Sequence, residues 1–160
     1  MATLEPRFFK REPEMTPKDT FVIILKRVCV ENNDIREAIM NRVLKIATVL
    51  CSTGFKEVTR EKAEEHYAPM KDSEHFESAI SQILPGPIQV FYCEGDRKAM
   101  REEIGHTYPS KAKPGTIRAD YAKSVEANLI HCSDSQEEAE REFKVWFGDY
   151  PIYECFSKKK

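Results

Sequence analysis

The segment Phe21-Val22-Ile23-Ile24-Leu25 is an unbroken run of apolar side chains near the start of the chain. Neighbouring side chains of a β-strand point to opposite faces, so a strand over residues 20–26 has two apolar faces. Such a strand is buried on both sides, and the sheet that contains it needs helices as cover. The run is also far shorter than the roughly 20 residues that cross a bilayer. We therefore expect a buried strand of a globular domain and no membrane partner.

Strand and helix patterns alternate along the rest of the chain. Further strands are expected over residues 48–58, with a bulge at Gly54, and over 88–94 and 127–131. Helices are expected from Asn33 or Asp34, over 60–67, from Ser73 to 84, over 96–104 and from Ser135 to 147. Residues 105–126 show little periodicity and are expected to form a long functional loop. The order β-α-β-α-α-β-α-β-α predicts an α+β fold of the split-βαβ kind, with helices over an antiparallel sheet.

Length and charge indicate one folded domain. The chain has 160 residues, of which 41% are hydrophobic and 32% are charged, the balance of a globular rather than a disordered protein. We expect an N-terminal extension over residues 1–18, one domain over 19–155 and a basic tail over 156–160. The net charge of −2 argues against a general nucleic-acid binder, although it allows a local basic pocket.

The cysteines and the amino terminus indicate a reducing compartment. Five cysteines, at positions 29, 51, 93, 132 and 155, are odd in number and widely spaced, and no Cys-x-x-Cys pair occurs. This pattern favours buried thiols over a disulfide framework or a structural zinc site. The first residues mix charges where a signal peptide would be apolar. We therefore expect a cytoplasmic protein.

A histidine and a glutamate near the C-terminal end are the first candidates for chemistry. His131 lies at the end of the last expected strand, just before the final helix. On that helix Glu142 falls on the apolar stripe of Ala139, Phe143 and Trp146, where an unpaired carboxylate is costly. It can accept a hydrogen bond from one imidazole nitrogen of His131 and leave the other nitrogen free as a base, ligand or nucleophile. The alternative is that Glu142 reaches solvent or pairs with an arginine, and periodicity alone does not decide between the two.

Cations and hydroxyls collect around the long loop, although the familiar phosphate loops are missing. The glycines form neither the dinucleotide-binding pattern nor a P-loop, and no kinase-type catalytic loop occurs. The loop region carries Arg101, Thr107, Lys111, Lys113, Thr116 and Arg118. Grouped arginines often grip phosphates, but solvated surface arginines are commoner still. The residues therefore indicate a phosphate site around a histidine, with solvated side chains as the alternative.

Three segments of this region carry a family resemblance. Lys113-Pro-Gly-Thr-Ile-Arg-Ala-Asp120 is followed by Asn128-Leu-Ile-His-Cys-Ser-Asp-Ser135 and by Ala139-Glu-Arg-Glu142. They closely resemble the active-site region of nucleoside diphosphate kinases, and the resemblance covers residues 20–147. It implies a ferredoxin-like, four-stranded antiparallel sheet (βαββαβ) covered by helices. It also implies ping-pong transfer of the γ-phosphate from a nucleoside triphosphate to a nucleoside diphosphate.

The resemblance further implies a role for each matching residue. His131 would be the nucleophile that becomes phosphohistidine, and Glu142 with Ser133 would orient its ring. Lys26 would contact the phosphates and the ribose, and Tyr67 would lie beside the histidine. The remaining nucleotide contacts would come from His75, Arg101, Thr107, Arg118, Val125 and Asn128. Mg²⁺ would be held mainly by the nucleotide phosphates rather than by protein ligands.

This chain departs from the family pattern at several positions. After Lys26 it has Arg27-Val28-Cys29, where the family usually has Pro-Asp-Gly. His75 stands at the position of the phenylalanine that stacks on the base, and an imidazole offers less stacking area. Cys132 replaces a glycine beside the nucleophile, and it would make the site sensitive to oxidation if its thiolate were exposed.

Two other functions stay open on the sequence alone. One is a nucleotide-binding or scaffold protein on the same fold with little transferase activity, which the changes after Lys26 and at His75 favour. The other is an RNA-binding sheet, which the lack of an interleaved aromatic and basic strand motif disfavours. For the kinase we expect nucleoside tri- and diphosphates as partners, and a homo-oligomer built on a dimer through the sheet, as a dimer, tetramer or hexamer.

Overall fold

The structure is a computed structural model that describes residues 19–122 and 129–148. The expected N-terminal extension over 1–18, the basic tail over 156–160, and the predicted contacts Val125 and Asn128 lie outside the described residues. Within the described ranges, no helix has the length and apolar character needed to cross a membrane.

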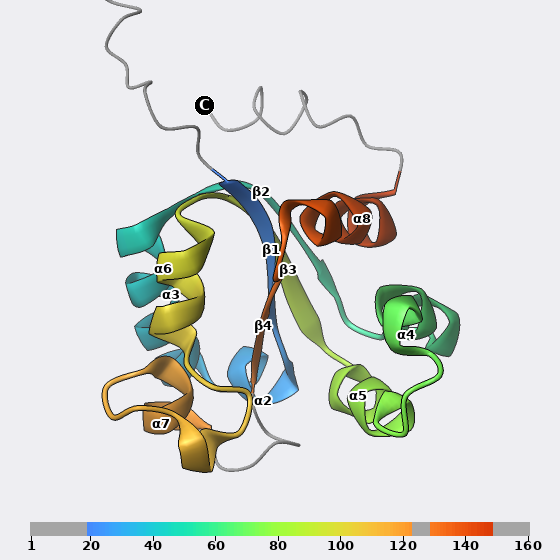
Figure 1. Cartoon of the computed structure of the whole chain (residues 1–160), viewed down its shortest axis with the longest axis horizontal. Coiled ribbons are helices and arrows are strands. Elements are labelled where there is room, and N and C mark those ends of the chain that lie inside the picture. Colours follow the sequence, from blue (N-terminus) through green and yellow to red (C-terminus); the bar gives the residue numbers. More distant parts are fainter. Residues whose placement is uncertain (1–18, 123–128, 149–160) are drawn as a thin grey trace, which may run out of the picture.

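Four strands form one sheet, in the order β2-β3-β1-β4. They are β1 (Asp19–Leu25), β2 (Ala47–Phe55), β3 (Ile88–Gly95) and β4 (Ile130–Cys132). β1 pairs antiparallel with both β3 and β4, and β2 pairs antiparallel with β3. The antiparallel four-stranded sheet expected from the sequence is therefore confirmed (Figure 1).

Helices cover both faces of this sheet. α3 (Asn33–Ile46), α6 (Arg97–Ile104) and α7 (Ile117–Tyr121) lie on one face, and α4 (Arg60–His66), α5 (Phe76–Ile83) and α8 (Gln136–Phe147) lie on the other (Figure 1). The remaining short elements are α2 (Arg27–Val30), η2 (Ala68–Met70) and η3 (Pro109–Lys111). The sheet is thus the middle layer of three, as a strand with two apolar faces requires.

β1 divides the core into two apolar layers. Phe21, Ile23 and Leu25 belong to the layer that also contains residues of α3 and α6. Val22 and Ile24 belong to the layer that contains residues of α5 and α8. All five side chains are 0% exposed. Because the central strand is locked from both sides, the residues at its C-terminal end are held in fixed positions beside β4.

The predicted helix starts are close to the observed ones. Ser135 caps α8 by accepting a hydrogen bond from the third backbone N–H after it, as the capping pattern predicts. The cap of α3 is Asn32 rather than Asn33 or Asp34, because the Asn32 side chain accepts from the backbone of Ile35. Three consecutive capping residues made this start ambiguous in the sequence.

The bulge of β2 differs from its predicted place. It lies at Leu50, between Val49 and Cys51, rather than at Gly54. The extra residue turns the Leu50 side chain into the layer that contains residues of α8, where it is buried. Gly54 instead pairs in register with Gln89 of β3.

Several segment boundaries also differ from expectation. β2 ends at Phe55 instead of residue 58, and α5 begins at Phe76 instead of Ser73, whose hydroxyl accepts a hydrogen bond from the backbone of His75 in a turn. Residues 105–122 are more regular than a loop, because they contain η3 and α7. Thr116 caps α7 with its hydroxyl. Elements this short, like α2, hold too few residues to show a period in the sequence.

The cysteines correct one expectation. Cys29, Cys93 and Cys132 are buried free thiols, as expected. Cys51 is disulfide-bonded, so the expectation that no cysteine forms a disulfide is wrong at this position. Cys51 is only half-buried and lies on β2, which is at one end of the strand order among the described residues, so neither burial nor sheet pairing on that side encloses it.

Two glycines of the sheet give a matched test of its packing. A Cβ atom on Gly95 would lie 2.7 Å from the carbonyl oxygen of Ile46, whereas on Gly54 its nearest neighbour would be 3.8 Å away. We expect Gly95→Ala to lower the free energy of unfolding by about 1–3 kcal/mol, because backbone has to move. Gly54→Ala should change it by less than about 0.5 kcal/mol. Urea unfolding measures both, and equal stability of the two variants would contradict this packing.

Candidate active site

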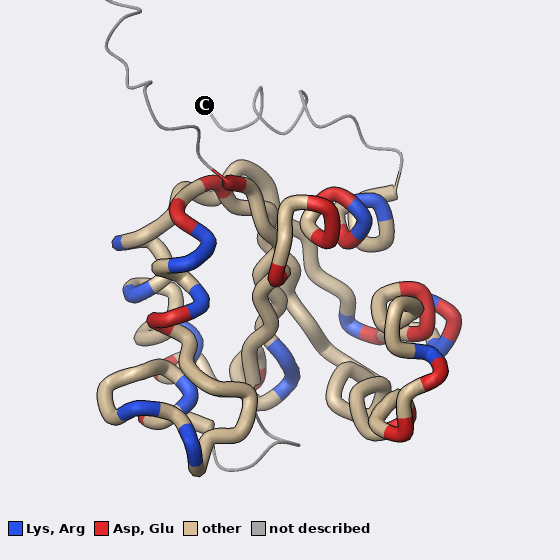
Figure 2. Tube along the Cα trace, in the orientation of Figure 1, with Lys and Arg blue, Asp and Glu red and all other residues tan. Residues whose placement is uncertain are grey.

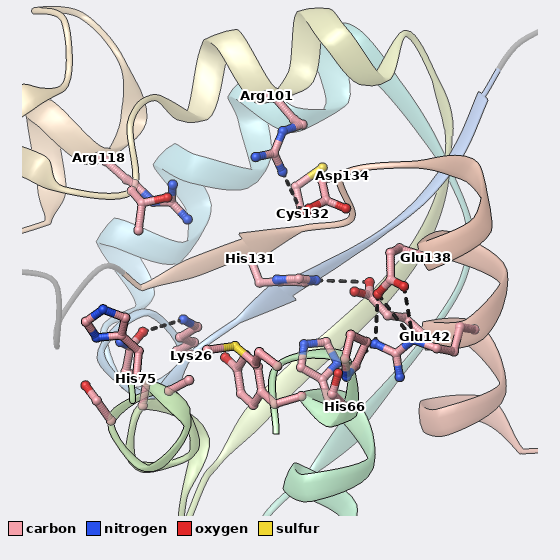
Figure 3. A pocket seen from close by; sticks show the side chains of 18 of the residues that line it. Lys26, His66, His75, Arg101, Arg118, His131, Cys132, Asp134, Glu138 and Glu142 are labelled. Carbon is pink, nitrogen blue, oxygen red and sulfur yellow. Dashed lines mark hydrogen bonds and ion pairs between the residues drawn. The ribbon is translucent and has the colours of Figure 1, made fainter. Parts of the chain in front are cut away.

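His131 and Glu142 meet at the centre of the site. His131 lies on β4, where it pairs with Ile24 of β1, and Glu142 comes from the buried face of α8. The imidazole Nε2 atom is 3.0 Å from Oε1 of Glu142 (Figure 3). The predicted contact is therefore confirmed. The alternative of a Glu142 that reaches solvent or pairs with an arginine is wrong, because the carboxylate is buried against His131.

Ser133 holds the same carboxylate from a second direction. Its hydroxyl donates to Oε1 of Glu142 at 2.6 Å and accepts from the backbone N–H of Val22 at 2.9 Å. The Ser133 side chain is fully buried. One carboxylate oxygen thus ties α8 to β4 and, through Ser133, to β1, and this fixes the orientation of the His131 ring.

The surroundings of Glu142 keep it ionised. Burial alone would raise the pKa of its carboxyl group, but the charge of His131 and the hydrogen bonds from His131 and Ser133 outweigh burial and lower the pKa to about 2. An ionised carboxylate only accepts hydrogen bonds, so Nε2 of His131 is the donor and carries the ring proton. In the neutral form of the ring this proton is the only one, so Nδ1 then carries a lone pair, and no hydrogen bond from the described residues reaches Nδ1. His131 can therefore present a nucleophilic nitrogen.

A second histidine packs against the first. The ring centroid of His66, the last residue of α4, lies 4.7 Å from that of His131, with the rings nearly perpendicular. Its Nδ1 atom accepts a hydrogen bond from the indole of Trp146 at 3.0 Å. Burial and then the nearby charge of His131 hold the pKa of His66 well below its ordinary value, so this ring is neutral. With Nδ1 occupied, the proton of the neutral ring sits on Nε2.

The same residues include a set of metal-ligand types. His66, His131 and Glu142 place one ligand-type atom each within 4.8 Å of the others. Two histidines and a glutamate also bind zinc in proteins. Here, however, Trp146 occupies a lone pair of His66, and the carboxylate accepts from His131 and Ser133. We interpret the cluster as a hydrogen-bond network that orients His131.

Lys26 and Arg118 bring two cations to the site. Lys26 follows β1 and is 6% exposed, and its Nζ atom donates to Oε1 of Gln82 at 2.9 Å. Burial and then the charge of Arg118 lower the pKa of Lys26 to about 7. The buried Arg118 donates to two backbone carbonyl groups, and burial followed by the charge of Arg101 lowers its pKa to about 10. Two buried cations that destabilise each other favour an anion between them.

A cavity of about 660 Å³ joins these groups. Figure 3 shows Arg101 and Arg118 on one side of His131, and Lys26 and His75 on the other. Basic residues recur along α6 and around α7, whereas acidic residues are frequent on α4 and α8 (Figure 2). The predicted site residues that line the cavity are Lys26, Tyr67, His75, Arg101, Thr107, Arg118, His131 and Glu142. Ser133 does not line the cavity but binds Glu142, which does. The structure therefore brings together all the predicted residues that it describes.

Comparison with known proteins identifies this arrangement. The family model described as nucleoside diphosphate kinase matches residues 18–152. The chain belongs to the nucleoside diphosphate kinase family. A nucleoside diphosphate kinase of Symbiobacterium thermophilum is 42% identical over 113 residues, which are 69% of this chain and 75% of that protein. One of Francisella tularensis is 36% identical over 141 residues, which are 87% of this chain and 99% of that protein.

Solved structures of the family agree. The nucleoside diphosphate kinase of Encephalitozoon cuniculi superposes with a TM-score of 0.74 at 30% identity, over 82% of this chain and 90% of that chain. That of Halobacterium salinarum, in complex with CDP, gives 0.72 at 31% identity, over 82% and 89%. These matches confirm the nucleoside diphosphate kinase activity expected from the motifs, and they do not favour the alternative of a weak binding or scaffold protein.

Two departures from the family pattern have a structural outcome. Arg27-Val28-Cys29 form part of α2, and the backbone N–H of Lys26 donates to the carbonyl of Leu129 at 2.9 Å, so Lys26 is anchored without the usual proline. Cys132 is 6% exposed, and burial raises the pKa of its thiol to about 12. An exposed thiolate was the condition for oxidation at Cys132, and that condition is not met.

His75 and Tyr67 mark the outer and inner parts of the kinase site. His75 precedes α5, and 67% of its side chain is exposed. The Tyr67 ring packs against His66 rather than directly on His131, with centroids 4.7 Å apart. Burial and then the charge of Glu142 raise the pKa of Tyr67, so its phenol stays neutral.

Three residues of the site escaped the sequence analysis as functional residues. His66 was visible only within the motif Glu65-His66-Tyr67, which fits the family. Gln82 binds Lys26 across two elements, and no pattern in the sequence marks it. Arg141 donates to the backbone carbonyls of Glu65 and His66 at 2.8 and 2.7 Å, and so holds the end of α4 against α8.

Replacement of Lys26 should stabilise the fold. Because its pKa is lowered from 10.5 to about 7 in the folded state, the unfolded chain binds the extra proton between these pH values. The stability of the native protein therefore rises from pH 7 to pH 10.5. We expect Lys26→Met to raise the free energy of unfolding by about 2–4 kcal/mol at pH 7, and the gain should shrink toward pH 10.5. Urea unfolding at both pH values measures it, and a gain that does not depend on pH would refute the assignment.

Proposed function

We propose that this kinase works by ping-pong transfer through a phosphohistidine on Nδ1 of His131. The contact between Nε2 and Glu142 carries the proposal, because it leaves Nδ1 with its lone pair at the cavity. In the first half-reaction Nδ1 bonds to the γ-phosphorus of a nucleoside triphosphate, and the bond from phosphorus to the β-phosphate oxygen breaks. The nucleoside diphosphate leaves with that electron pair. A second nucleoside diphosphate then takes the phosphoryl group by the reverse step.

Glu142 supports this step through the far side of the ring. The imidazole gains positive charge as Nδ1 bonds to phosphorus, and the carboxylate that accepts from Nε2 stabilises that charge. Ser133 keeps the carboxylate in place. His66 stays neutral beside the nucleophile, so it adds no repulsion as the charge develops.

The cations would receive the phosphates. Phosphoryl transfer depends chiefly on positioning and on neutralising the charge of the equatorial oxygens. Lys26, Arg101 and Arg118 line the cavity that holds His131, and Thr107 adds a hydroxyl. His75 at the rim would stack on the base. Tyr67 would support the histidine pair, and Val125 and Asn128 remain predicted nucleotide contacts.

Mg²⁺ would enter the site bound to the phosphates of the nucleotide. Magnesium prefers oxygen ligands, and Glu142 is already engaged by His131 and Ser133. The cations of the cavity favour an anionic ligand such as a nucleotide phosphate, which would carry the metal. When bound there, Mg²⁺ supplies neutralisation of charge shared between phosphate oxygens.

The assembly and location of the kinase stay predictions. Among the described residues β2 is an edge strand of the sheet, and edge strands can pair with a second chain, which supports a dimer through the sheet. A tetramer or hexamer would be built on that dimer, and light scattering distinguishes the three sizes. A cytoplasmic location, with neither nucleic-acid nor membrane partners, remains an expectation from the sequence.

Loss of His131 should abolish the phosphoenzyme. Incubated with γ-³²P-labelled ATP and Mg²⁺, the native protein should take up a label that is stable to alkali and labile to acid, and GDP should chase that label into GTP. His131→Ala should take up no label, while its circular dichroism spectrum stays that of the native fold. His106→Ala is the matched control, because His106 is an exposed histidine that does not line this cavity. Labelling or normal turnover in His131→Ala would defeat the mechanism.

A further inference from the structure

Gln82 is a hydrogen-bond partner of Lys26 that comes from a distant part of the sequence. It lies on α5, 56 residues after Lys26, and lines the same cavity as His131. Its Oε1 atom accepts a hydrogen bond from Nζ of Lys26 at 2.9 Å. Figure 3 shows the Lys26 side chain on the same side of the cavity as His75, the residue before α5.

An ammonium in this place needs a positioning contact. Lys26 has a flexible stem with four rotatable carbons, and its charge is compact. Arg118 on α7 repels it. The other titratable groups that line the cavity are His66 and Tyr67 at the end of α4, His75 before α5, Arg101 on α6, Tyr108 before η3, His131 and Cys132 on β4, Asp134 before α8, and Glu138, Arg141 and Glu142 on α8. Of the carboxylates, Glu142 is engaged by His131 and Ser133, and Glu138 is paired with Arg141. Gln82 on α5 is a neutral acceptor, so its contact holds the ammonium without adding a negative charge.

We propose that Gln82 is a positioning residue of the phosphoryl transfer, which holds the ammonium of Lys26 where the nucleotide phosphates bind and acts only through Lys26. The proposal rests on the phosphate-binding role proposed above for Lys26. A hydrogen bond between a neutral and a charged group contributes enough that its loss weakens nucleotide binding roughly tenfold.

A double-mutant cycle tests whether Gln82 acts through Lys26. ADP binding is measured by calorimetry for the native protein, Gln82→Leu, Lys26→Met and the double variant. We expect Gln82→Leu to weaken ADP binding roughly tenfold in the native background and less than about twofold in the Lys26→Met background. Ser81→Ala is the matched control, since Ser81 is exposed on the same helix, bonds only to the carbonyl of Ser78 and does not line the cavity.

The isosteric variant Gln82→Glu tests the same role through the pH dependence of ADP binding. A purely structural role of Gln82 would leave this pH dependence unchanged. Its carboxylate still accepts from Lys26 but neutralises the ammonium and keeps it protonated to higher pH. In the native protein ADP binding should weaken as the pH rises above 7, because Lys26 loses its proton. In Gln82→Glu this decline should begin at higher pH, and binding at pH 7 should be weaker than in the native protein.

The outcomes separate the two proposals. Equal losses on Gln82→Leu in both backgrounds would overturn the positioning role, and so would unchanged ADP binding in Gln82→Leu. Unchanged ADP binding in Lys26→Met would defeat the role of Lys26 itself, and the positioning role with it. If Gln82→Leu does not fold by circular dichroism, an unshifted pH profile in Gln82→Glu overturns the proposal on its own.

Discussion

The buried carboxylate of Glu142 is the interaction on which the site depends. A single oxygen of this group accepts hydrogen bonds from His131 of β4 and from Ser133, whose hydroxyl is itself bound to the backbone of β1. An unpaired charge on the apolar face of α8 would be destabilising, and the hydrogen bonds from both His131 and Ser133 satisfy this carboxylate where the helix docks on the sheet. The contact that secures the last helix is therefore the same contact that exposes Nδ1 of His131.

The three-layered fold determines where the cationic groups of the site lie relative to Glu142 and His131. β1 is buried on both faces, and Lys26 follows it directly, with its backbone bonded to Leu129 at the start of β4. Lys26 and His131 thus come from adjacent strands, which leaves little freedom in their separation. Arg118 arrives from α7 on the opposite face of the sheet. The site forms where both faces meet at the end of β4, and neither helical layer could build it alone.

The sequence predicted the parts of the site that periodicity or motif could reveal. Glu142 was identified because a charged residue interrupts an apolar stripe, and its contact with His131 followed from the closeness of strand and helix. Gln82 could not be identified in this way, since its contact joins elements 56 residues apart and a glutamine on a helix carries no pattern. The bulge at Leu50 was not predicted either, because no pattern in the sequence marks it. Gly54 was the obvious residue to relax the strand, but the core required a buried side chain at Leu50 instead.

The distribution of charged side chains in the cavity supports the proposal that it binds an anion. The buried anion Glu142 is reserved for His131, and Glu138 at the cavity is paired with Arg141 at 2.9 Å. Lys26 donates to the side-chain amide of Gln82, and Arg118 donates to two backbone carbonyls, and these three acceptors are uncharged. Burial is the largest cause of the lowered pKa at both cations, and a neighbouring arginine lowers each pKa further. In the proposed function a phosphate chain would lie beside these cations, and nucleotide binding would recover part of the free energy that the fold gives up to bury them.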